Sequence, residues 1–317
     1  MDNLIFSFNV VMPVFLIIGL GYFVKSNNMI DDHFVNIAIK FNFKVGLSTL
    51  LFKNIYTAEL GNAFSPKLLI FTFLSITGVV IILWLIVPLF IKDSKKASAM
   101  IHTIYRSNFV LLGIPLWINM FGESNISSIS LMLPVAIPAF NLFAVIILAA
   151  FDETESVNKH TKIKSTIANI MKNPLIIASL LAIITKLFSI KLPLFLENAV
   201  LSVASLGTPL ALITLGAQFN FENLLKNLEY SIAAVLGRLI VVPAFVVTLS
   251  IILGFRGYEL GGIFILFSSP SAVSSYIMAK EMNSNYELTG EVVVLTTLCS
   301  MFTIILGIYI LRTLSLI

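Results

Sequence analysis

Apolar runs of about 20 residues recur along the whole chain of 317 residues, and they leave few folds open. A helix of that length matches the thickness of the hydrocarbon core of a bilayer. Only 11% of the residues are charged and 58% are hydrophobic, whereas soluble domains average about 25% charged residues. The runs are continuous rather than alternating, which excludes a porin-like barrel. The sequence therefore predicts an all-α polytopic membrane protein embedded in a lipid bilayer.

We predict ten transmembrane helices, at residues 4–24, 34–55, 67–91, 98–121, 126–151, 170–190, 194–217, 229–253, 258–280 and 290–313. Each is long enough to cross a bilayer with some tilt. The longest polar connection, residues 152–169, falls at the middle of the chain and is too short for a soluble domain. This arrangement divides the chain into a first half (residues 1–151), a linker (152–169) and a second half (170–317).

The placement of lysine and arginine predicts the orientation in the membrane. Loops after odd-numbered spans carry ten basic residues, and loops on the other side carry six. The excess places the linker 152–169 in the cytoplasm and both termini outside it. Met1-Asp2-Asn3 adds no basic segment before the first span, so we expect no cleavable signal peptide. The predicted location is the plasma membrane, crossed several times.

Five spans on each side of the linker suggest a duplication. An odd number of spans per half makes the two halves inverted in the membrane. Short sequence echoes agree with this interpretation: Met12-Pro13-Val14 in the first span with Asn173-Pro174-Leu175 in the sixth, and Pro88 in the third with Pro243 in the eighth. We therefore predict two inverted five-helix repeats.

The fourth and ninth spans contain residues that ordinary membrane helices avoid. In the fourth, Asn108 is followed by Gly113 and Pro115, and Pro115 lacks an N–H and clashes with the preceding turn. In the ninth, Pro270 lies in a serine-rich stretch. Asn108 and Pro270 lie about 15 and about 18 Å from the starts of their spans, near the midplane. We predict broken crossover helices 4 and 9, unwound around Gly113–Pro115 and Pro270, which is typical of transporter sites. A kinked helix with small packing residues is the alternative for the fourth span.

The charges within the predicted spans favour an anionic substrate. No aspartate or glutamate is central in a span, whereas Lys44, Arg106 and Arg238 lie about 12 to 15 Å deep. A cation carrier or a two-carboxylate proton antiporter would need an acidic group at the midplane. Snorkelling toward the interface is an alternative explanation for Arg106 and Arg238, and it is harder to apply to Lys44.

The predicted substrate site consists of Asn108, Gly113, Pro115, Pro270, Ser271, Asn141, Lys44 and Ser48. Two of these have competing structural roles: Asn141 could join helices by hydrogen bonds, and Ser48 could bond to its own helix backbone. His102 is the one histidine inside a span. It is a candidate for proton coupling, although its position near the cytoplasmic end also suits an interfacial role.

No sequence motif indicates catalysis or cofactor binding. Three dispersed histidines and one cysteine make no zinc set, and neither a phosphate loop nor a nucleotide fingerprint is present. The net charge of +4 does not suggest a nucleic-acid partner. We expect a non-enzymatic protein without a metal or cofactor, for which a homodimer is a possible assembly.

Four motifs together resemble the auxin efflux carrier family of membrane transporters, and they extend over almost the whole chain. They are Arg106-Ser-Asn108-Phe-Val-Leu-Leu-Gly113-Ile-Pro115-Leu in the fourth span, Asn173-Pro174-Leu175 in the sixth, Gly207-Thr-Pro209-Leu210-Ala211 in the seventh and Ser269-Pro270-Ser-Ala-Val-Ser in the ninth. The second span departs from the family's usual pattern, because Ser48-Thr49-Leu50-Leu51-Phe52 contains no proline. We expect the helix geometry beside the site to differ there.

The resemblance implies a ten-helix inverted-repeat fold of the sodium/proton antiporter and bile-acid symporter type. In that fold a panel of helices forms a scaffold, and a second group with the two crossing helices moves. The implied substrates are small organic anions, such as auxin in plants and malate or similar carboxylates in bacteria. We therefore predict a secondary transporter, for efflux of carboxylates or auxin-like acids, that works by alternating access. A sodium- or proton-coupled symporter and a non-transporting receptor are the alternatives.

Overall fold

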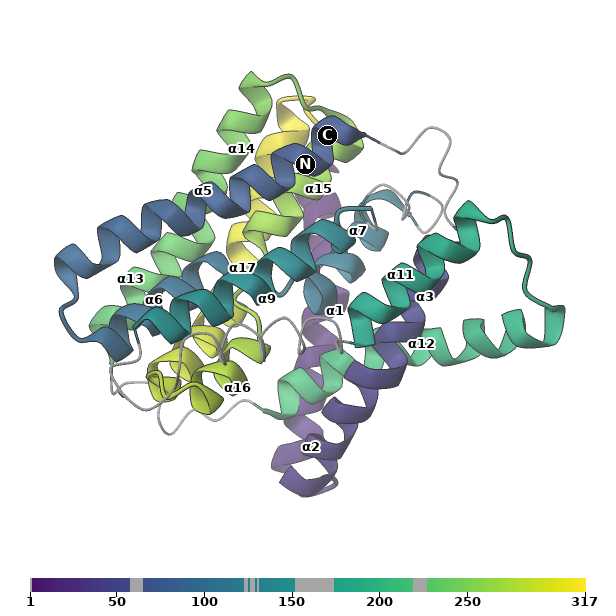
Figure 1. Ribbon diagram of the computed structural model, residues 1–317, viewed down its shortest axis with the longest axis horizontal. Coiled ribbons are helices and arrows are strands. Elements are labelled where there is room, and N and C mark those ends of the chain that lie inside the picture. Colours follow the sequence, from purple (N-terminus) through teal and green to yellow (C-terminus); the bar gives the residue numbers. More distant parts are fainter. Residues whose placement is uncertain are drawn as a thin grey trace.

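The computed structural model describes residues 2–57, 65–122, 125, 129, 131–151, 174–218 and 227–317, which are helical apart from short connections (Figure 1). The predicted linker 152–169 lies outside the described residues. The helices are α1 (Asp2–Ser26), α2 (Asp32–Phe41), α3 (Leu47–Tyr56), α5 (Pro66–Phe90), α6 (Ser94–Tyr105), α7 (Ile114–Phe121), α9 (Leu133–Ala150), α11 (Pro174–Leu187), α12 (Leu194–Ala217), α13 (Leu228–Leu236), α14 (Val242–Ile252), α15 (Gly257–Ser268), α16 (Ser274–Glu281) and α17 (Tyr286–Thr313).

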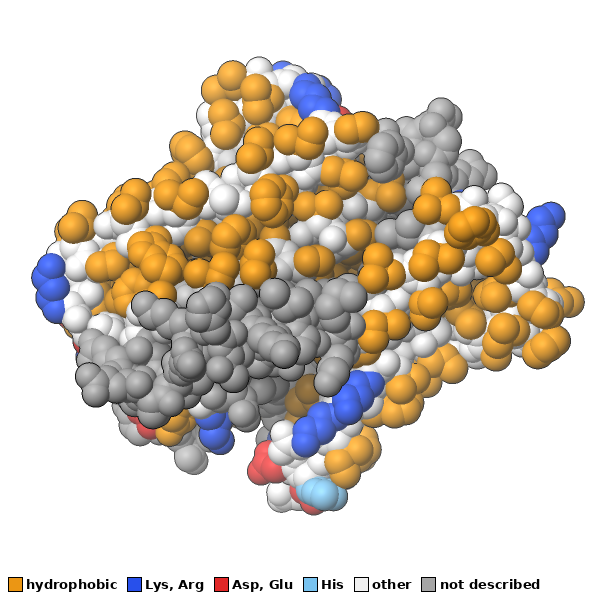
Figure 2. All heavy atoms as spheres, in the orientation of Figure 1, with side chains coloured by type: hydrophobic (Ala, Val, Ile, Leu, Met, Phe, Trp, Pro, Cys, Tyr) orange, Lys and Arg blue, Asp and Glu red, His pale blue; other side chains and the backbone are white. Residues whose placement is uncertain are grey.

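Six helices in the described part are long and apolar enough to cross a membrane: α1, α5, α9, α12, α17 and the continuous helix Leu228–Ile252. Shorter apolar helices cover Phe109–Phe121 and Gly257–Ser268, and every one of the ten predicted ranges contains helix. Figure 2 shows hydrophobic side chains spread over α5, α9, α11 and α12, with lysine and arginine at the edges and in the lower part of the view. The prediction of a polytopic helical membrane protein is confirmed.

Polar side chains at the helix starts define several boundaries. Asp31, Ser65, Asp93 and Asn285 each accept a hydrogen bond from the backbone N–H three residues later. Such caps satisfy N–H groups that have no partner within the helix. At Asp31, the N–H of Phe34 lowers the pKa of the carboxyl below its ordinary value, because the bond favours the charged form.

The described helices form two groups (Figure 1). In the first, which we call the panel group, α1 packs along α12, α2 packs on α12, and α3 packs on both α11 and α12. The second, which we call the crossover group, contains α5, α6, α7, α9 and α13 to α17. The groups meet mainly where α1 contacts α7 and α17, and where α11 contacts α9.

Two glycines let α1 and α12 approach closely within the panel group. A Cβ atom at Gly21 would overlap the backbone of Ile213, and one at Gly216 would overlap the carbonyl of Ile18. Small residues at such positions allow membrane helices to pack at short distances. Gly19 has open space around its Cα, so only the face of α1 that meets α12 requires glycine.

Pro115 does not break its helix, contrary to the prediction. One helix runs from Phe109 to Phe121 through a wide π-type turn at Phe109–Gly113. A proline ring clashes with the carbonyl four residues earlier and offers no N–H, and a widened turn directly before the proline makes room for the ring. The same arrangement precedes Pro243, where the π-type turn covers Gly237–Val241.

Two short extended segments interrupt the helices of the crossover group. Arg106–Asn108 separates α6 from the helix that begins at Phe109, and Ser269–Val273 separates α15 from α16. The second interruption confirms the break predicted at Pro270. The first lies before the predicted position at Gly113–Pro115, and this is a correction to the sequence-based prediction.

Candidate functional site

The two interruptions meet and hydrogen-bond to each other. The N–H of Asn108 donates to the carbonyl oxygen of Pro270 at 2.8 Å, and the N–H of Ala272 donates to the carbonyl oxygen of Arg106 at 3.1 Å. Unwound backbone inside a bilayer needs protein partners, because no water is available there. Each interruption supplies partners for the other. This pairing explains why the fourth span unwinds at Arg106 to Asn108, although no proline lies there.

Arg238 joins the ends of both half-helices at the crossing. Its side chain is fully buried, with 0% exposure, so the snorkelling interpretation is wrong for this residue. Its guanidinium donates to the carbonyl oxygens of Ser269 (2.8 and 2.6 Å), Ile104 (3.1 Å), Tyr105 (3.2 Å) and Leu266 (3.3 Å). These carbonyls lie at the C-terminal ends of α6 and α15, where helix dipoles place partial negative charge. One buried cation thus caps two helices.

A cavity of about 530 Å³ lies beside the crossing. It is lined by α2, the turn Asn42–Gly46, the segment 106–111, α9, the last turns of α12, and α16 with the residues around it. Most of the described wall is apolar. Three lining side chains are basic, Lys40, Lys44 and Arg106, and none of the described lining residues is acidic. The lysines are exposed, whereas Arg106 is only 7% exposed.

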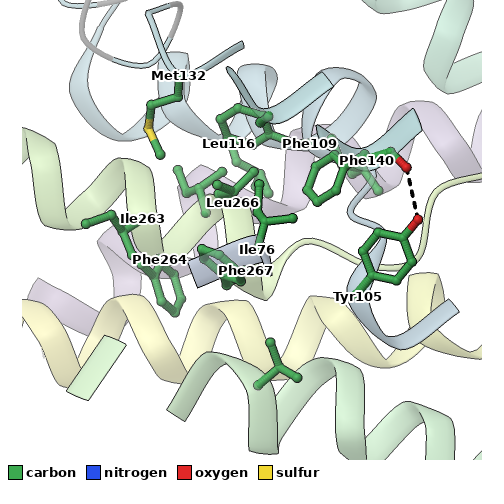
Figure 3. Close-up of a cluster of buried hydrophobic side chains, with 14 of the residues drawn as sticks. Ile76, Tyr105, Phe109, Leu116, Met132, Phe140, Ile263, Phe264, Leu266 and Phe267 are labelled. Carbon is green, nitrogen blue, oxygen red and sulfur yellow. Dashed lines mark hydrogen bonds between the residues drawn. The ribbon is translucent and has the colours of Figure 1, made fainter. Parts of the chain in front are cut away.

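The cavity lies on one side of the crossing. Its wall reaches Gln218 and Met282, next to the connections that follow α12 and α16. On the other side α7 and α15 are packed together through aromatic rings, with Phe121 and Tyr258 at 5.1 Å and Trp117 and Tyr258 at 6.1 Å between centroids. Figure 3 shows Leu116 of α7 among the buried side chains of α15. The described cavity therefore lies on the side of the crossing where α12 and α16 end, and the packed rings lie on the other side.

Arg106 lies at the first interruption and reaches two neighbouring elements. Its Nη2 donates to Oδ1 of Asn141 on α9 at 2.7 Å and to the hydroxyl of Ser274 at 3.2 Å. Its Nη1 donates to the carbonyl of Phe140 at 3.3 Å. The same carbonyl accepts the hydroxyl of Tyr105 at 2.9 Å (Figure 3). The sequence offered snorkelling as the explanation for Arg106, and the structure instead places its guanidinium among buried groups at the cavity wall.

Asn108 and Asn141 both line the cavity, as does Lys44. Asn108 is 4% exposed, and its side-chain amide nitrogen has no hydrogen-bond partner among the described residues. A buried donor without a partner is costly, and Asn108 carries this donor at the wall of the cavity. The helices that begin at Phe109 and Ser274 have no side-chain cap. Their N-terminal ends border the same cavity and carry partial positive charge.

The other predicted site residues do not line the cavity. Gly113 packs against Phe109 and Ile265, and Pro115 is buried in α7. The Pro270 carbonyl accepts the bond from Asn108, as described above. Ser271 pairs with Ser107 across the interruptions and donates its hydroxyl to the carbonyl of Thr103, and its N–H donates to the hydroxyl of Thr296. These residues build the crossing rather than the cavity surface.

The second span contains a third π-type turn, Asn42–Gly46. The Asn42 amide donates to the carbonyl of Gly207 on α12 at 2.9 Å, and the hydroxyl of Ser48 donates to the carbonyl of Phe43 at 3.0 Å. Ser48 thus bonds to its own helix, which was the competing interpretation for this residue. The turn places Lys40 and Lys44 on the cavity wall.

His102 and Glu291 are further buried titratable residues outside the cavity lining. His102 on α6 is 0% exposed, and neither ring nitrogen has a partner among the described residues, so an interfacial position is wrong. Glu291 near the start of α17 is 4% exposed and accepts bonds from the backbone and side chain of Asn227 and from Ser231. No cluster of histidine, cysteine, aspartate or glutamate within the described residues could hold a metal ion.

Comparison with known proteins agrees over nearly the whole chain. A family model described as a membrane transport protein matches residues 6–308. The chain is 24% identical over 305 residues to an uncharacterized transporter of Methanocaldococcus jannaschii, with 94% of this chain and 96% of the relative covered. It is 23% identical over 313 residues to an uncharacterized transporter of Methanothermobacter thermautotrophicus, with the same coverage of 94% and 96%. Both interruptions and the cavity lie inside the matched region.

Proposed function

Because the chain belongs to the membrane transport protein family, whose members resemble auxin efflux carriers, we propose that it is a secondary transporter that exports small organic anions. Carboxylates and auxin-like acids are the proposed substrates. The transporters among its relatives support the general activity. The choice of an anion rests on the chain's own cavity.

One observation carries the proposal: three basic side chains and no acidic ones line the described wall of the cavity. Two uncapped helix N-termini, at Phe109 and Ser274, add partial positive charge. A cation, a metal ion or a neutral sugar would gain nothing from this field. The volume of about 530 Å³ is within the usual range of about 300–1,000 Å³ for small-molecule sites. An anion with an apolar body matches both the charge and the wall.

The proposed architecture is a ten-helix inverted repeat in which spans four and nine cross. Helices in all ten ranges and the meeting of the two interruptions support it. The crossover group would move against the panel group and expose the site to each side in turn. With the orientation given by the positive-inside rule, the termini are outside the cell and the cavity opens to the cytoplasm. Each anionic charge that leaves would gain about 2.3 kcal/mol per 100 mV of inside-negative potential.

The test is transport in proteoliposomes with a panel of labelled mono- and dicarboxylates. We expect saturable flux of at least one acid by the wild-type protein. Asn108→Ala should lower this flux at least about tenfold, because the substrate loses a buried donor. Asn198→Ala, at an exposed position on α12 outside the cavity, should transport like the wild type. Saturable binding without flux would contradict transport and indicate a receptor, and equal flux by Asn108→Ala would remove Asn108 from the site.

Coupling to protons is the alternative that one observation favours. His102 is buried one helical turn before Arg106, and its ring nitrogens have no hydrogen-bond partner in the part of the chain that the structure describes, so a proton on its ring would change the charge near the site. A sodium-coupled symporter is the other variant. Uphill accumulation driven by a pH gradient, and lost in His102→Asn, would establish proton coupling. Accumulation that requires a sodium gradient would establish the sodium-coupled variant, and indifference to both gradients would leave uniport.

A further inference from the structure

Arg106 differs from the other basic residues of the cavity in its depth and its surroundings. Lys40 and Lys44 are exposed side chains of the panel group, whereas Arg106 is more than nine-tenths buried at the crossing. Asn108, two residues later, has the unpartnered amide nitrogen described above. The deepest positive charge of the cavity and its unused hydrogen-bond donor therefore lie on the same short extended segment.

The charge of Arg106 has no negative counterpart among the described residues. Its acceptors are the Phe140 carbonyl, the Asn141 amide oxygen and the Ser274 hydroxyl, all of them neutral. A buried cation is costly unless a charge or several dipoles compensate it. Arg238, also buried, has the carbonyl ends of two helices around it. Arg106 lacks such a set and borders the cavity instead, so an anion in the cavity would compensate it.

The donors of Arg106 are only partly used. A guanidinium has five N–H donors in a fixed planar fork. Three take the acceptors named above, and the hydroxyl of Tyr105 also lies beside the guanidinium. Asn141 and Ser274 both bind Nη2, which fixes the plane of the fork from one end. The unused N–H groups do not share one edge of the guanidinium, because both Nη2–H groups are taken, so an anion in the cavity would receive single charge-assisted hydrogen bonds from Arg106.

We propose that Arg106 is the anchor for a single carboxylate head group of the transported molecule, and that Asn141 and Ser274 are positioning residues that orient its guanidinium. The proposal rests on the proposed function and adds the residue that binds the negative charge of the substrate. Arg106, Asn141 and Ser274 all belong to the crossover group, while Lys40 and Lys44 belong to the panel group. A molecule held at Arg106 therefore moves with the crossing, and the lysines attract it only while the cavity is open.

The experiment compares two probes of equal shape, benzoate and the neutral benzamide, in binding to the purified full-length protein. We expect the wild type to bind benzoate at least about tenfold more tightly than benzamide, as a charge-assisted contact with a buried cation predicts. Arg106→Gln should abolish this preference and weaken benzoate about 10- to 100-fold while leaving benzamide unchanged. Arg106→Lys should retain part of the preference, because it keeps the charge without the fork. Arg256→Gln, at an exposed arginine far from the cavity lining, should match the wild type.

A second variant keeps the test decisive if Arg106→Gln does not fold. Asn141→Asp retains the acceptor that faces Nη2 at 2.7 Å and adds a carboxylate that neutralises Arg106 in place. It should lose benzoate binding as Arg106→Gln does, with benzamide binding retained. Ser274→Ala should reduce the benzoate preference less, because Asn141 still holds the fork.

The two proposals fail in different ways. If the wild type and Asn141→Asp bind benzoate equally tightly, or if no variant changes the preference, Arg106 is not the anchor. If the preference for benzoate depends on Arg106 but proteoliposomes show no flux of any acid, Arg106 is the carboxylate anchor and the protein is not a transporter of these acids. Flux that is saturable and unchanged in Arg106→Gln overturns the anchor and leaves transport intact. A wild type that prefers neither probe overturns the anchor as well.

Discussion

The guanidinium of Arg238 donates two hydrogen bonds, from Nε at 2.8 Å and from Nη2 at 2.6 Å, to the carbonyl oxygen of Ser269. Ser269 is the first residue after α15, and the same guanidinium reaches the last carbonyls of α6 through Nη1. The two half-helices that stop at the crossing are thereby joined through one side chain from another span. The crossing owes its shape to this cap as well as to the backbone pairing of Asn108 with Pro270.

Replacing Arg238 should destabilise the protein strongly. Arg238→Met leaves several buried carbonyls without a donor, each at a cost of about 1–3 kcal/mol, so we expect a loss of about 3 kcal/mol or more in the free energy of unfolding. Arg238→Lys should recover only part of this loss, because an ammonium cannot reach both helix ends as the fork does. Thermal unfolding in detergent measures the effect. The control is Arg256→Met, because the exposed Arg256 donates to the nearby carbonyls of Ile251 and Phe255. Equal unfolding temperatures for Arg238→Met and Arg256→Met would show that Arg238 does not stabilise the ends of α6 and α15.

The contact between α1 and α12 predicts opposite effects at two nearby glycines. Gly21→Ala inserts a methyl group into the backbone of α12 and should cost about 1–3 kcal/mol, as overpacking does. Gly19→Ala meets open space and should be neutral or stabilise the helix by up to about 1 kcal/mol. The two variants have the same chemistry on the same helix. A similar melting temperature for both would show that α1 and α12 are not packed this closely.

The one-sided cavity predicts one-sided chemical access. In a Cys299→Ser background, Met282→Cys at the cavity wall should react with a membrane-impermeant thiol reagent from the side of the connections that follow α12 and α16. The positive-inside rule makes that side the cytoplasm, so labelling should occur in inside-out vesicles. Leu116→Cys, fully buried on the side of the packed rings, should stay unlabelled from both faces. Labelling of Met282→Cys only from outside would reverse the proposed orientation.

The two exposed lysines of the cavity, Lys40 and Lys44, should affect the rate at which an anion binds more than the rate at which it dissociates. Exposed charges at a site entrance raise the rate at which opposite charges arrive, and salt screens this effect. The double change Lys40→Gln with Lys44→Gln should lower kcat/KM for an anion about 3- to 10-fold at low ionic strength. The difference from the wild type should vanish at high salt. Lys191→Gln, exposed and outside the cavity lining, serves as the control, and a deficit that persists at high salt would make the lysines direct ligands.

The interruption of the ninth span could be predicted because its cause is local. Pro270 has no N–H and forces Ser269 into an extended conformation, with φ −61° and ψ 147°. The same local reasoning misplaced the interruption of the fourth span. Pro115 is as strong a helix breaker as Pro270, but the wide turn at Phe109–Gly113 absorbs it. The extended segment Arg106–Asn108 contains no residue that demands it.

The sequence by itself determined that this chain spans a membrane with many helices, and that two of these helices are interrupted near polar residues and prolines. The length and hydrophobicity of the segments suffice for these conclusions, because lipid requires every span to be long, apolar and hydrogen-bonded within itself. Only the tertiary structure decided where the fourth span opens, since the partners for its backbone come from Pro270 and Ala272. It also separated two arginines that look alike in sequence: Arg238 faces helix ends, and Arg106 faces a cavity. Which groups surround a buried charge depends on elements distant in the chain, and only the folded arrangement brings them together.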